Sequence, residues 1–298
     1  MMKKLLFEGT ATALVTPFKG DGIDFDAMGR LIDMQSEGGV GALVICGTTG
    51  EAPTLEDGEH LDAIEFAADY VKKSGYDIKI IAGTGSNNTD HAVMMSREAE
   101  IRGADGLLWV TPYYNKTTQR GLLHHYETLA GATDLPAIIY NVPSRTGVDI
   151  VPDTAEALSK IENIVAIKEA TGNVARTVEI ISRCGDELYV YSGNDDVVVP
   201  MMSVGAKGVI SVLSNICPGE TEKMCRLAKE GDFKSAGAMQ VKFYPLIKAL
   251  FCEVNPIPVK TALELMGKID GSLRLPLYEM EEKNKAKLEA EMKKLGII

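Results

Sequence analysis

Eight short apolar runs recur along this chain of 298 residues, and amphipathic stretches separate them. Their sequences are TALVTPF, GALVICG, IKIIAGT, GLLWVTP, AIIYNV, IVAIKEA, LYVYSG and GVISV. Continuous apolar strands that alternate with helical patterns are typical of a parallel sheet covered by helices. Eight such units are the number that closes a barrel. The pattern therefore predicts an α/β fold, a (β/α)8 TIM barrel over residues 1–217 that carries the active site.

The stretches between these runs show the periodicity of amphipathic helices. Residues 55–75, for example, place apolar side chains on one face of a helix. Those side chains are Leu61, Ile64, Ala68 and Val71. We expect this helix to end at Gly75, shortly after two lysines, because basic residues and glycine are favoured at helix C-termini.

After the last run the apolar strands stop and helical patterns continue alone. Proline and glycine interrupt this part at NPIP, MGKIDG and RLPL. The final stretch, EMEEKNKAKLEAEMKKLG, is highly charged with apolar residues at helical spacing, which is typical of a solvated surface helix. We therefore expect residues 218–298 to form a C-terminal helical extension that packs on the barrel.

The formal net charge of -11 narrows the range of partners. Such a charge repels nucleic acid and anionic lipid, so small molecules are the expected partners. Glu8 interrupts the N-terminal apolar residues before a secretory signal could form. No segment reaches the roughly 18 uninterrupted apolar residues of a membrane span. We expect a cytoplasmic protein that neither crosses a membrane nor binds nucleic acid.

One lysine stands inside an apolar run. In IVAIKEA, the two-residue periodicity of a strand puts Lys168 on the same face as Ala166 and Ala170. Val165 and Ile167 then face the other side. Burial disfavours an ammonium and lowers the pKa of a lysine toward ~7–8, which yields a neutral amine nucleophile. Taken alone, the segment fits a strand-end lysine paired with a carboxylate somewhat better.

The loops after two other runs carry hydroxyl and guanidinium groups. GALVIC is followed by GTTGE, in which the hydroxyls of Thr48 and Thr49 join the loop amides as donors suited to a carboxylate. AIIYNV carries Tyr140 near its end, whose phenol can relay protons, and Arg145 in the next loop can grip a carboxylate. Each of these could instead be a turn residue, a barrel filler or a surface ion pair.

Common cofactor and metal motifs do not occur in the sequence. GTGSNN lacks the third glycine of a dinucleotide fingerprint, and neither a Walker A nor an HExxH motif is present. The four histidines lie in helix-like segments, and the five cysteines never form a C-x-x-C pair. We expect no metal site. WVTPYYNK adds two phenols, Tyr113 and Tyr114, of which one could serve only in packing.

Seven motifs together resemble the dihydrodipicolinate synthase family of pyruvate-dependent class I aldolases. In order they are GTTGEAPTL, VTPYYNK, YNVPSRTG, AIKEATGN, YSGND, GVISV and NPIPVKTAL, and they cover nearly the whole chain. The resemblance implies condensation of pyruvate with L-aspartate 4-semialdehyde to 4-hydroxy-tetrahydrodipicolinate. That reaction is the first committed step of lysine and diaminopimelate biosynthesis. The resemblance implies no cofactor for this reaction, because pyruvate itself is bound to the enzyme as a covalent imine.

The resemblance also implies a role for each site residue. Lys168 forms the imine, which becomes an enamine that attacks the aldehyde. Thr48, Tyr140 and Tyr114 form a proton relay, in which Tyr114 reaches in from an adjacent subunit of a homotetramer, a dimer of dimers. The substrate-binding residues are Thr49 for the pyruvate carboxylate, Arg145 for the semialdehyde carboxylate, and Gly193 and Ile210, which line the site through backbone carbonyls.

Members of this family often carry an L-lysine feedback site at a subunit interface. The matching residues here are His60, Asn87 and Tyr113. His91, however, stands where lysine-sensitive members have an acidic residue. Because a histidine cannot replace a carboxylate as the partner of the effector's ammonium, we expect weak or absent feedback.

Three other functions compete with the synthase. Another pyruvate-dependent aldolase, such as an N-acetylneuraminate lyase or a 2-keto-3-deoxy sugar-acid aldolase, is the nearest, although N-acetylneuraminate lyases typically lack arginine at position 145. A non-catalytic barrel that senses keto acids is the second. A nicotinamide-dependent oxidoreductase is the third, and the incomplete glycine pattern disfavours it.

Overall fold

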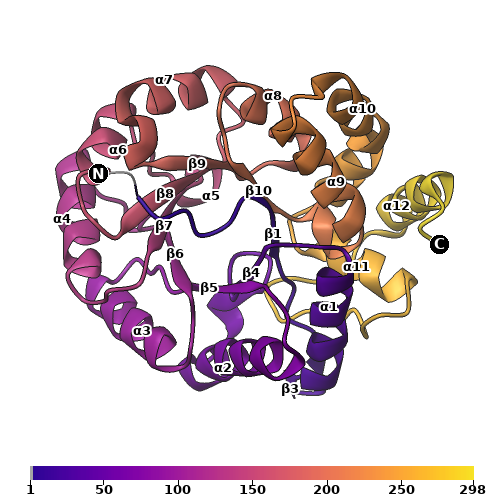
Figure 1. Cartoon of the computed structure of the whole chain (residues 1–298). Helices are drawn as coiled ribbons and strands as arrows, with labels where there is room; N and C mark the ends of the chain where they lie inside the picture. Colours follow the sequence, from indigo (N-terminus) through magenta and orange to yellow (C-terminus); the bar gives the residue numbers. More distant parts are fainter. Residues whose placement is uncertain (1–2) are drawn as a thin grey trace.

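The computed structural model describes residues 3–298, and eight parallel strands within that range close into a barrel (Figure 1). The strands are β1 (Gly9–Ala13), β4 (Ala42–Ile45), β5 (Lys79–Gly83), β6 (Gly106–Val110), β7 (Ala137–Asn141), β8 (Ile164–Glu169), β9 (Tyr189–Ser192) and β10 (Gly208–Ser211). Each strand pairs with the next in this order, and β10 pairs with β1. The predicted (β/α)8 barrel is confirmed.

Helices form a ring around the strands (Figure 1). They are α1 (Phe25–Glu37), α2 (Asp57–Ser74), α3 (Thr89–Ile101), α4 (Gln119–Ala130), α6 (Pro152–Leu158), α7 (Val174–Cys184), α8 (Val198–Ser203) and α9 (Pro218–Lys229). Shorter elements lie in the loops, namely the hairpin β2 (Phe18–Lys19) and β3 (Gly22–Ile23), helix α5 (Pro143–Thr146), and 3-10 turns at Ala52–Thr54, Gly185–Glu187, Asp195–Val197 and Leu213–Asn215. The strand ends and these loops provide the place for a site.

The first strand lies earlier than the apolar run TALVTPF indicates. It covers the small residues Gly9–Ala13, and Leu14 is buried just after it. The reason is close backbone packing between β1 and β10, which pairs Gly9 with Gly208. A Cβ on Gly208 would lie 1.8 Å from the carbonyl oxygen of Gly9, so this pairing needs glycine.

Helix α2 follows the sequence prediction with one difference. It ends before Gly75, which adopts the left-handed conformation that favours glycine, with φ 69°. Of the four apolar residues predicted for its buried face, Leu61, Ile64 and Val71 are buried. Ala68 is only half-buried and lies beside Gly103, which follows α3.

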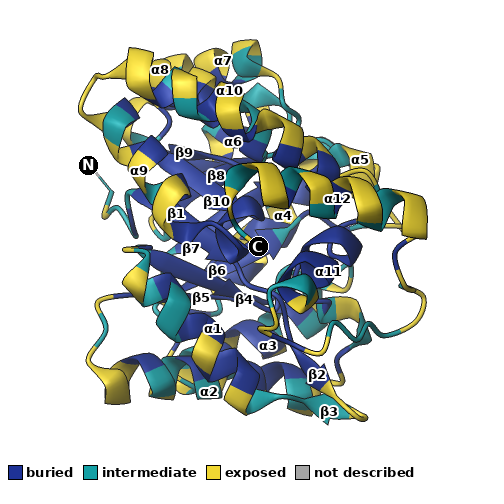
Figure 2. Cartoon of the chain, turned by 90° about the vertical axis from the view of Figure 1, so that its right-hand side faces the viewer, coloured by how far each residue is buried: buried dark blue, intermediate teal, exposed yellow. Residues whose placement is uncertain are grey.

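Apolar side chains form two cores. One fills the barrel interior with residues such as Ala11, Val44, Ile81 and Tyr191. The larger one lies between the strands and the surrounding helices. Figure 2 shows the result, with strands buried along their length and helices exposed only on their outer faces. The barrel is a rigid frame for the loops at its ends.

Helices joined by loops make up the described part of the chain after β10, which contains no further strand, as predicted. Helix α9 packs against β1 and α1 and so completes the ring. Helices α10 (Phe233–Leu250), α11 (Ile257–Leu265) and α12 (Glu282–Leu295) then lie outside the ring on one side of the barrel (Figure 1). In α12 the buried residues are Leu288 and Met292, as expected of a surface helix. The division into two units at residue 217 stays a prediction.

Candidate active site

A cavity of about 220 Å³ lies at the C-terminal end of the barrel strands. A larger hollow of about 1280 Å³ lies at the opposite end, where Lys3, Lys79 and Pro136 are among its lining residues. Judged by volume alone, the larger hollow would be the candidate site. Active sites of (β/α)8 barrels nevertheless lie at the C-terminal end, where the loops that follow the strands converge. The smaller cavity also gathers the residues that the sequence singled out, and we take it as the site.

Most of the predicted site residues meet in this cavity. Its lining includes Thr48, Thr49, Tyr140, Arg145, Lys168 and Gly193. Ile210 lies on β10 and is buried in the barrel interior. Tyr114, in contrast, is 91% exposed and does not line the cavity of its own chain.

Lys168 is buried near the end of β8. Its side chain has 6% exposure, and its Nζ lies 4.2 Å from the centroid of the Tyr140 ring. The pKa of Lys168 is lowered from 10.5 to about 7: burial lowers it most, the charge of Asp195 partly opposes the fall, and the charge of Arg145 adds to it. Within residues 3–298 no carboxylate forms a salt bridge with Lys168. The alternative of a strand-end ion pair is therefore not what the structure contains.

The predicted alternation along β8 is wrong at Val165. Ala137 and Ile138 are consecutive on β7, yet their partners on β8 are Ile164 and Ala166. Val165 is thus an extra residue at a register shift, and it belongs with Ala166 to the barrel interior. A bulge of this kind changes which face the following side chains occupy, and sequence periodicity does not reveal it.

Tyr140 lies on β7 next to Lys168 and is buried. Burial raises the pKa of its phenol, while the charge of Arg145 and a hydrogen bond with Thr48 act in the opposite direction. The phenol is consequently protonated at neutral pH. A protonated phenol in contact with a hydroxyl can pass a proton in either direction, as a relay requires.

Asn255 is a site residue to which the sequence analysis gave no role. It lies in the segment between α10 and α11, and its Nδ2 donates a hydrogen bond to Thr49 Oγ1 at 3.0 Å. Arg145 Nη2 donates to the backbone oxygen of Asn255 at 3.3 Å. The side-chain oxygen of Asn255 is buried and has no hydrogen-bond partner within the described chain. The motif NPIPVKTAL contained this residue, but its contacts cross more than 100 positions of sequence.

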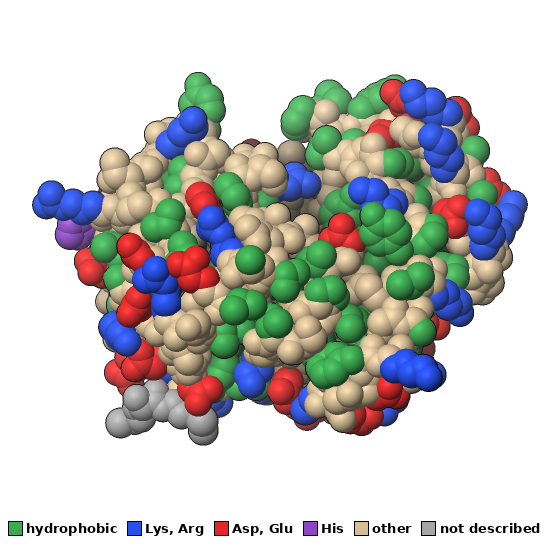
Figure 3. Space-filling model, turned by 90° about the horizontal axis from the view of Figure 1, so that it is seen from above, with side chains coloured by type: hydrophobic (Ala, Val, Ile, Leu, Met, Phe, Trp, Pro, Cys, Tyr) green, Lys and Arg blue, Asp and Glu red, His purple; other side chains and the backbone are tan. Residues whose placement is uncertain are grey.

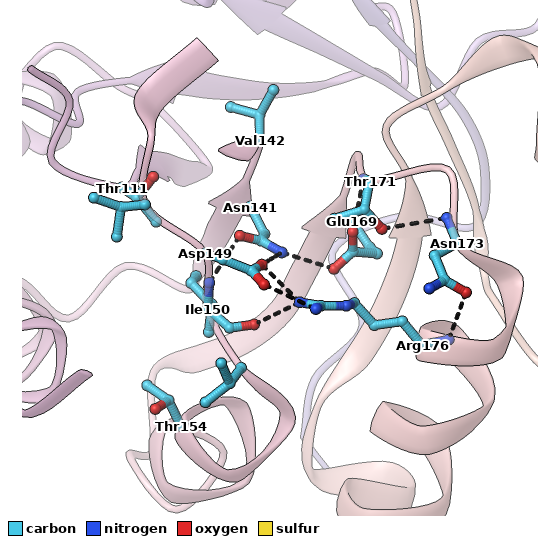
Figure 4. A network of polar contacts seen from close by, with 12 residues as sticks. Thr111, Asn141, Val142, Asp149, Ile150, Thr154, Glu169, Thr171, Asn173 and Arg176 are labelled. Atoms are coloured by element: carbon cyan, nitrogen blue, oxygen red, sulfur yellow. Dashed lines mark hydrogen bonds and ion pairs between the residues drawn. The ribbon is translucent and has the colours of Figure 1, made fainter. Parts of the chain in front are cut away.

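A polar network supports the ends of β7 and β8 from behind (Figure 4). Arg176 grips the Asp149 carboxylate with two hydrogen bonds of 2.6 and 2.8 Å. Asn141 Nδ2 donates at 3.0 Å both to Asp149 and to Glu169. The other oxygen of Glu169 accepts from the backbone amide of Thr171 at 2.7 Å. Because Asn141 and Glu169 directly follow the buried tyrosine and lysine, the network fixes both side chains in place.

Asp195 organises the loop after β10. Its carboxylate accepts hydrogen bonds from the amides of Val212 and Leu213 at 2.9 and 3.0 Å, and from the Ser211 hydroxyl at 2.5 Å. Burial raises the pKa of Asp195, and these hydrogen bonds and the charge of Lys168 oppose the rise. The carboxylate is the nearby charge that opposes the loss of the Lys168 proton.

The three residues predicted for the effector site and His91 lie near one another, with an unexpected carboxylate among them. His60 is buried, its Nε2 lies 2.8 Å from a backbone carbonyl oxygen, and burial lowers its pKa to about 4. Asn87 donates to the backbone oxygen of Tyr113 at 3.2 Å. His91 contacts Asp57 at 2.9 Å. The weak feedback stays a prediction, but its premise was incomplete because Asp57 supplies a carboxylate beside His91.

Three further sequence expectations concern metals, membranes and surface charge. No group of three or more His, Cys, Asp and Glu side chains that could hold a metal ion occurs among residues 3–298. None of the helices in the described range has both the length and the apolar character to cross a membrane. Acidic and basic side chains are interspersed over the face in Figure 3.

The fold and this arrangement define the class of protein. It is a (β/α)8 barrel whose strand ends carry a buried lysine, without a salt bridge to any described carboxylate, and a protonated phenol beside it. The family model of the dihydrodipicolinate synthetase family matches residues 6–295. This chain belongs to that family.

Individual relatives are similar in sequence to this chain over almost their full length. A 4-hydroxy-tetrahydrodipicolinate synthase from Lachnoclostridium phytofermentans is 50% identical over 98% of this chain and 99% of its own. The crystal structure of dihydrodipicolinate synthase from Aquifex aeolicus has a TM-score of 0.94 and 49% identity, covering 98% and 99% of the two chains. A chloride-inhibited dihydrodipicolinate synthase from Acinetobacter baumannii, solved in complex with pyruvate, has a TM-score of 0.95 and 44% identity, covering 98% and 99%.

Proposed function

We propose that this protein condenses pyruvate with L-aspartate 4-semialdehyde to give 4-hydroxy-tetrahydrodipicolinate, the first committed step of lysine and diaminopimelate biosynthesis. The observation that carries the proposal is the buried Lys168, whose pKa of about 7 leaves a substantial fraction of neutral amine at neutral pH. Relatives that match almost the whole chain carry the name of this synthase. The reaction takes place in the cytoplasm and needs neither a metal nor an organic cofactor.

In the first half of the reaction, Lys168 reacts with pyruvate. The amine lone pair attacks the keto carbon, the keto oxygen leaves as water, and an imine results. Loss of a proton from the methyl group then gives an enamine. The Thr49 hydroxyl and the neighbouring loop amides hold the pyruvate carboxylate, because donors in a tight loop suit an anion. Tyr140 and Thr48 are in contact and carry the protons that these steps release and consume.

In the second half, the enamine attacks the aldehyde carbon of L-aspartate 4-semialdehyde. A carbon-carbon bond forms, and the aldehyde oxygen takes up a proton to become a hydroxyl. The substrate's own amine then attacks the imine carbon, which closes the ring and releases Lys168. Arg145 binds the semialdehyde carboxylate, because its guanidinium lies at the cavity and matches a carboxylate in geometry. Gly193 and Ile210 border the substrates with their backbone carbonyls.

Tyr114 completes the proton relay from an adjacent subunit of a homotetramer. Two observations support this role. The side chain is 91% exposed, which is unusual for a large aromatic residue, and the residue has φ 68°. A non-glycine residue in the left-handed region costs energy, and such strain clusters at functional sites. A tyrosine held in this way at the surface suits insertion into a neighbouring chain.

The test is a steady-state assay of the purified protein with pyruvate and L-aspartate 4-semialdehyde, in which a coupled reductase follows the cyclic product. We expect turnover that is lost in Lys168→Ala. If the folded wild type shows no turnover while pyruvate is still trapped on Lys168 by borohydride, the protein is a sugar-acid aldolase, and product analysis with sialic acid or 2-keto-3-deoxygluconate identifies which. If borohydride traps nothing, the protein is a keto-acid sensor.

A further inference from the structure

A fully buried ion pair joins the loop after β4 to helix α11 of the C-terminal extension. Lys260 Nζ lies 2.6 Å from Glu51 Oε1, and both side chains have 0% exposure. The two residues are 209 positions apart in the sequence. The other carboxylate oxygen of Glu51 accepts a hydrogen bond from the backbone amide of Arg274 at 3.1 Å. The Glu51 carboxylate is therefore held from two points of the extension.

Glu51 is the last residue of the GTTGE loop, and its backbone shapes that loop. It adopts φ 54°, and Cys46, just before the loop, adopts φ 55°. Two non-glycine residues in the left-handed region thus bracket the loop, a conformation that persists only when surrounding contacts enforce it. The amide of Glu51 donates to the carbonyl of Thr48 at 3.2 Å. Glu51 thus forms the ion pair and also closes the turn that carries Thr48 and Thr49.

Stability alone does not account for this pair. A buried ion pair gains little over apolar side chains of similar size, because both charges must lose their hydration. Burial lowers the pKa of Lys260, and the Glu51 charge opposes that shift. Unlike an apolar contact, the ion pair is directional, because it fixes the position of one carboxylate relative to one amine. Such a contact specifies a loop conformation better than it stabilises a fold.

We propose that Lys260 and Glu51 are positioning residues for substrate binding, which hold the hydroxyls and amides of the GTTGE loop in the arrangement that receives the pyruvate carboxylate. The inference rests on the proposed function of the same site. Through these contacts, the C-terminal extension contributes to substrate binding by positioning the GTTGE loop. The hydrogen bond from Asn255, which lies just before α11, to Thr49 acts on the same loop.

The experiment compares two double variants of the full chain. Lys260→Met with Glu51→Gln removes both buried charges with side chains of similar size and leaves no unpaired charge. Lys285→Met with Glu264→Gln is the matched control, because that pair joins the same residue types at 3.4 Å on the surface, with side chains 34% and 44% exposed. For the buried pair we expect the KM for pyruvate to rise at least tenfold, with kcat within about fivefold of wild type. For the control pair we expect wild-type KM values.

Further measurements separate positioning from folding. Circular dichroism, melting temperature and sedimentation establish that each variant is folded and assembled. Borohydride trapping of Lys168 at saturating pyruvate should be complete in the buried-pair variant, with the half-saturating pyruvate concentration raised as much as KM. If that variant does not fold, Glu51→Asp alone decides, because it keeps both charges of the pair and only shortens the side chain that carries the carboxylate, and a KM raised about threefold is expected.

A folded variant of the buried pair with a wild-type KM for pyruvate overturns the inference, as does an equal rise in KM for the surface-pair control. A fall in kcat at unchanged KM also overturns it, because that result assigns the pair to chemistry or general stability. If the wild type itself neither turns over nor binds pyruvate, the proposed function fails, and this outcome is distinct because it appears before any variant is made.

Discussion

Replacement of Lys168 by methionine should stabilise the folded protein, and the gain should shrink as the pH rises. The folded chain holds the lysine side chain away from water and in no salt bridge with a described carboxylate, whereas the unfolded chain leaves it solvated. Between pH 7 and 10.5 the unfolded chain therefore keeps a proton that the folded chain has lost. Raising the pH through this window favours folded wild type relative to its unfolded state. Methionine has a similar length and no proton to lose, so its stability lacks this contribution.

The magnitude follows from the shift of the Lys168 pKa from 10.5 to about 7. At about 1.4 kcal/mol for each pKa unit, the lysine costs roughly 4 kcal/mol of folding free energy at pH 7, about 2 at pH 9 and almost nothing at pH 11. Attraction between the ammonium and the Tyr140 ring, whose centroid is 4.2 Å away, opposes the cost. Because the folded-state pKa already contains every interaction of the ammonium, the expected gain stays about 4 kcal/mol at pH 7 and about 2 kcal/mol at pH 9.

The assay is guanidinium unfolding of wild type and Lys168→Met at pH 7 and pH 9, at one protein concentration. Differences in packing between the two side chains do not depend on pH, so the change in the stability difference between the two pH values isolates the titration of Lys168. Lys285→Met, which removes a half-exposed lysine, is the control and should show little pH dependence. A stability difference for Lys168→Met that is the same or larger at pH 9 would refute the argument.

The other expectations concern catalysis and binding. The kcat/KM for pyruvate should rise about tenfold per pH unit below the Lys168 pKa of about 7 and level off above it, because only the neutral amine attacks; a profile that is flat between pH 5 and 7 contradicts this. Arg145→Ala should raise the KM for the semialdehyde about a hundredfold, roughly the 3 kcal/mol of a lost charged hydrogen bond, while borohydride still traps pyruvate at the wild-type concentration; loss of pyruvate binding instead would assign Arg145 to the first substrate. Mixed oligomers of Lys168→Ala and Tyr114→Ala subunits, refolded together, should recover part of the activity that each lacks, and no recovery would contradict a role of Tyr114 in the site of a neighbouring subunit. The free energy of unfolding of Lys260→Met should be about 3–5 kcal/mol lower than that of wild type, because the variant leaves a buried carboxylate unpaired. An unchanged denaturation midpoint would show that water reaches Glu51.

The strand pattern predicted the barrel because a parallel strand buried on both faces needs a continuous apolar run, and such runs are visible in the sequence. The same signal placed β1 too late. Its small residues, chosen for close approach to β10 at Gly208, are less apolar than Leu14 that follows them. The bulge at Val165 was also invisible, because register shifts depend on the neighbouring strand.

Sequence reasoning located the candidate site at the strand ends but missed the contacts that hold it together. Asn255, Lys260 and Arg274 reach the GTTGE loop across more than 200 positions of sequence, and nothing in their local pattern indicates a partner. Asp57 was overlooked for the same reason, since its contact with His91 joins two helices. Residues that touch substrate have recognisable chemistry, whereas residues that position them become visible only in the fold.

Reduction with borohydride in the presence of pyruvate tests the central role of Lys168 most directly. Mass spectrometry of the digested protein should locate one reduced pyruvate adduct, and it should lie on the peptide that contains Lys168. Labelling should depend on pyruvate and disappear in Lys168→Ala. An adduct on another lysine, or turnover without any adduct, would contradict the account.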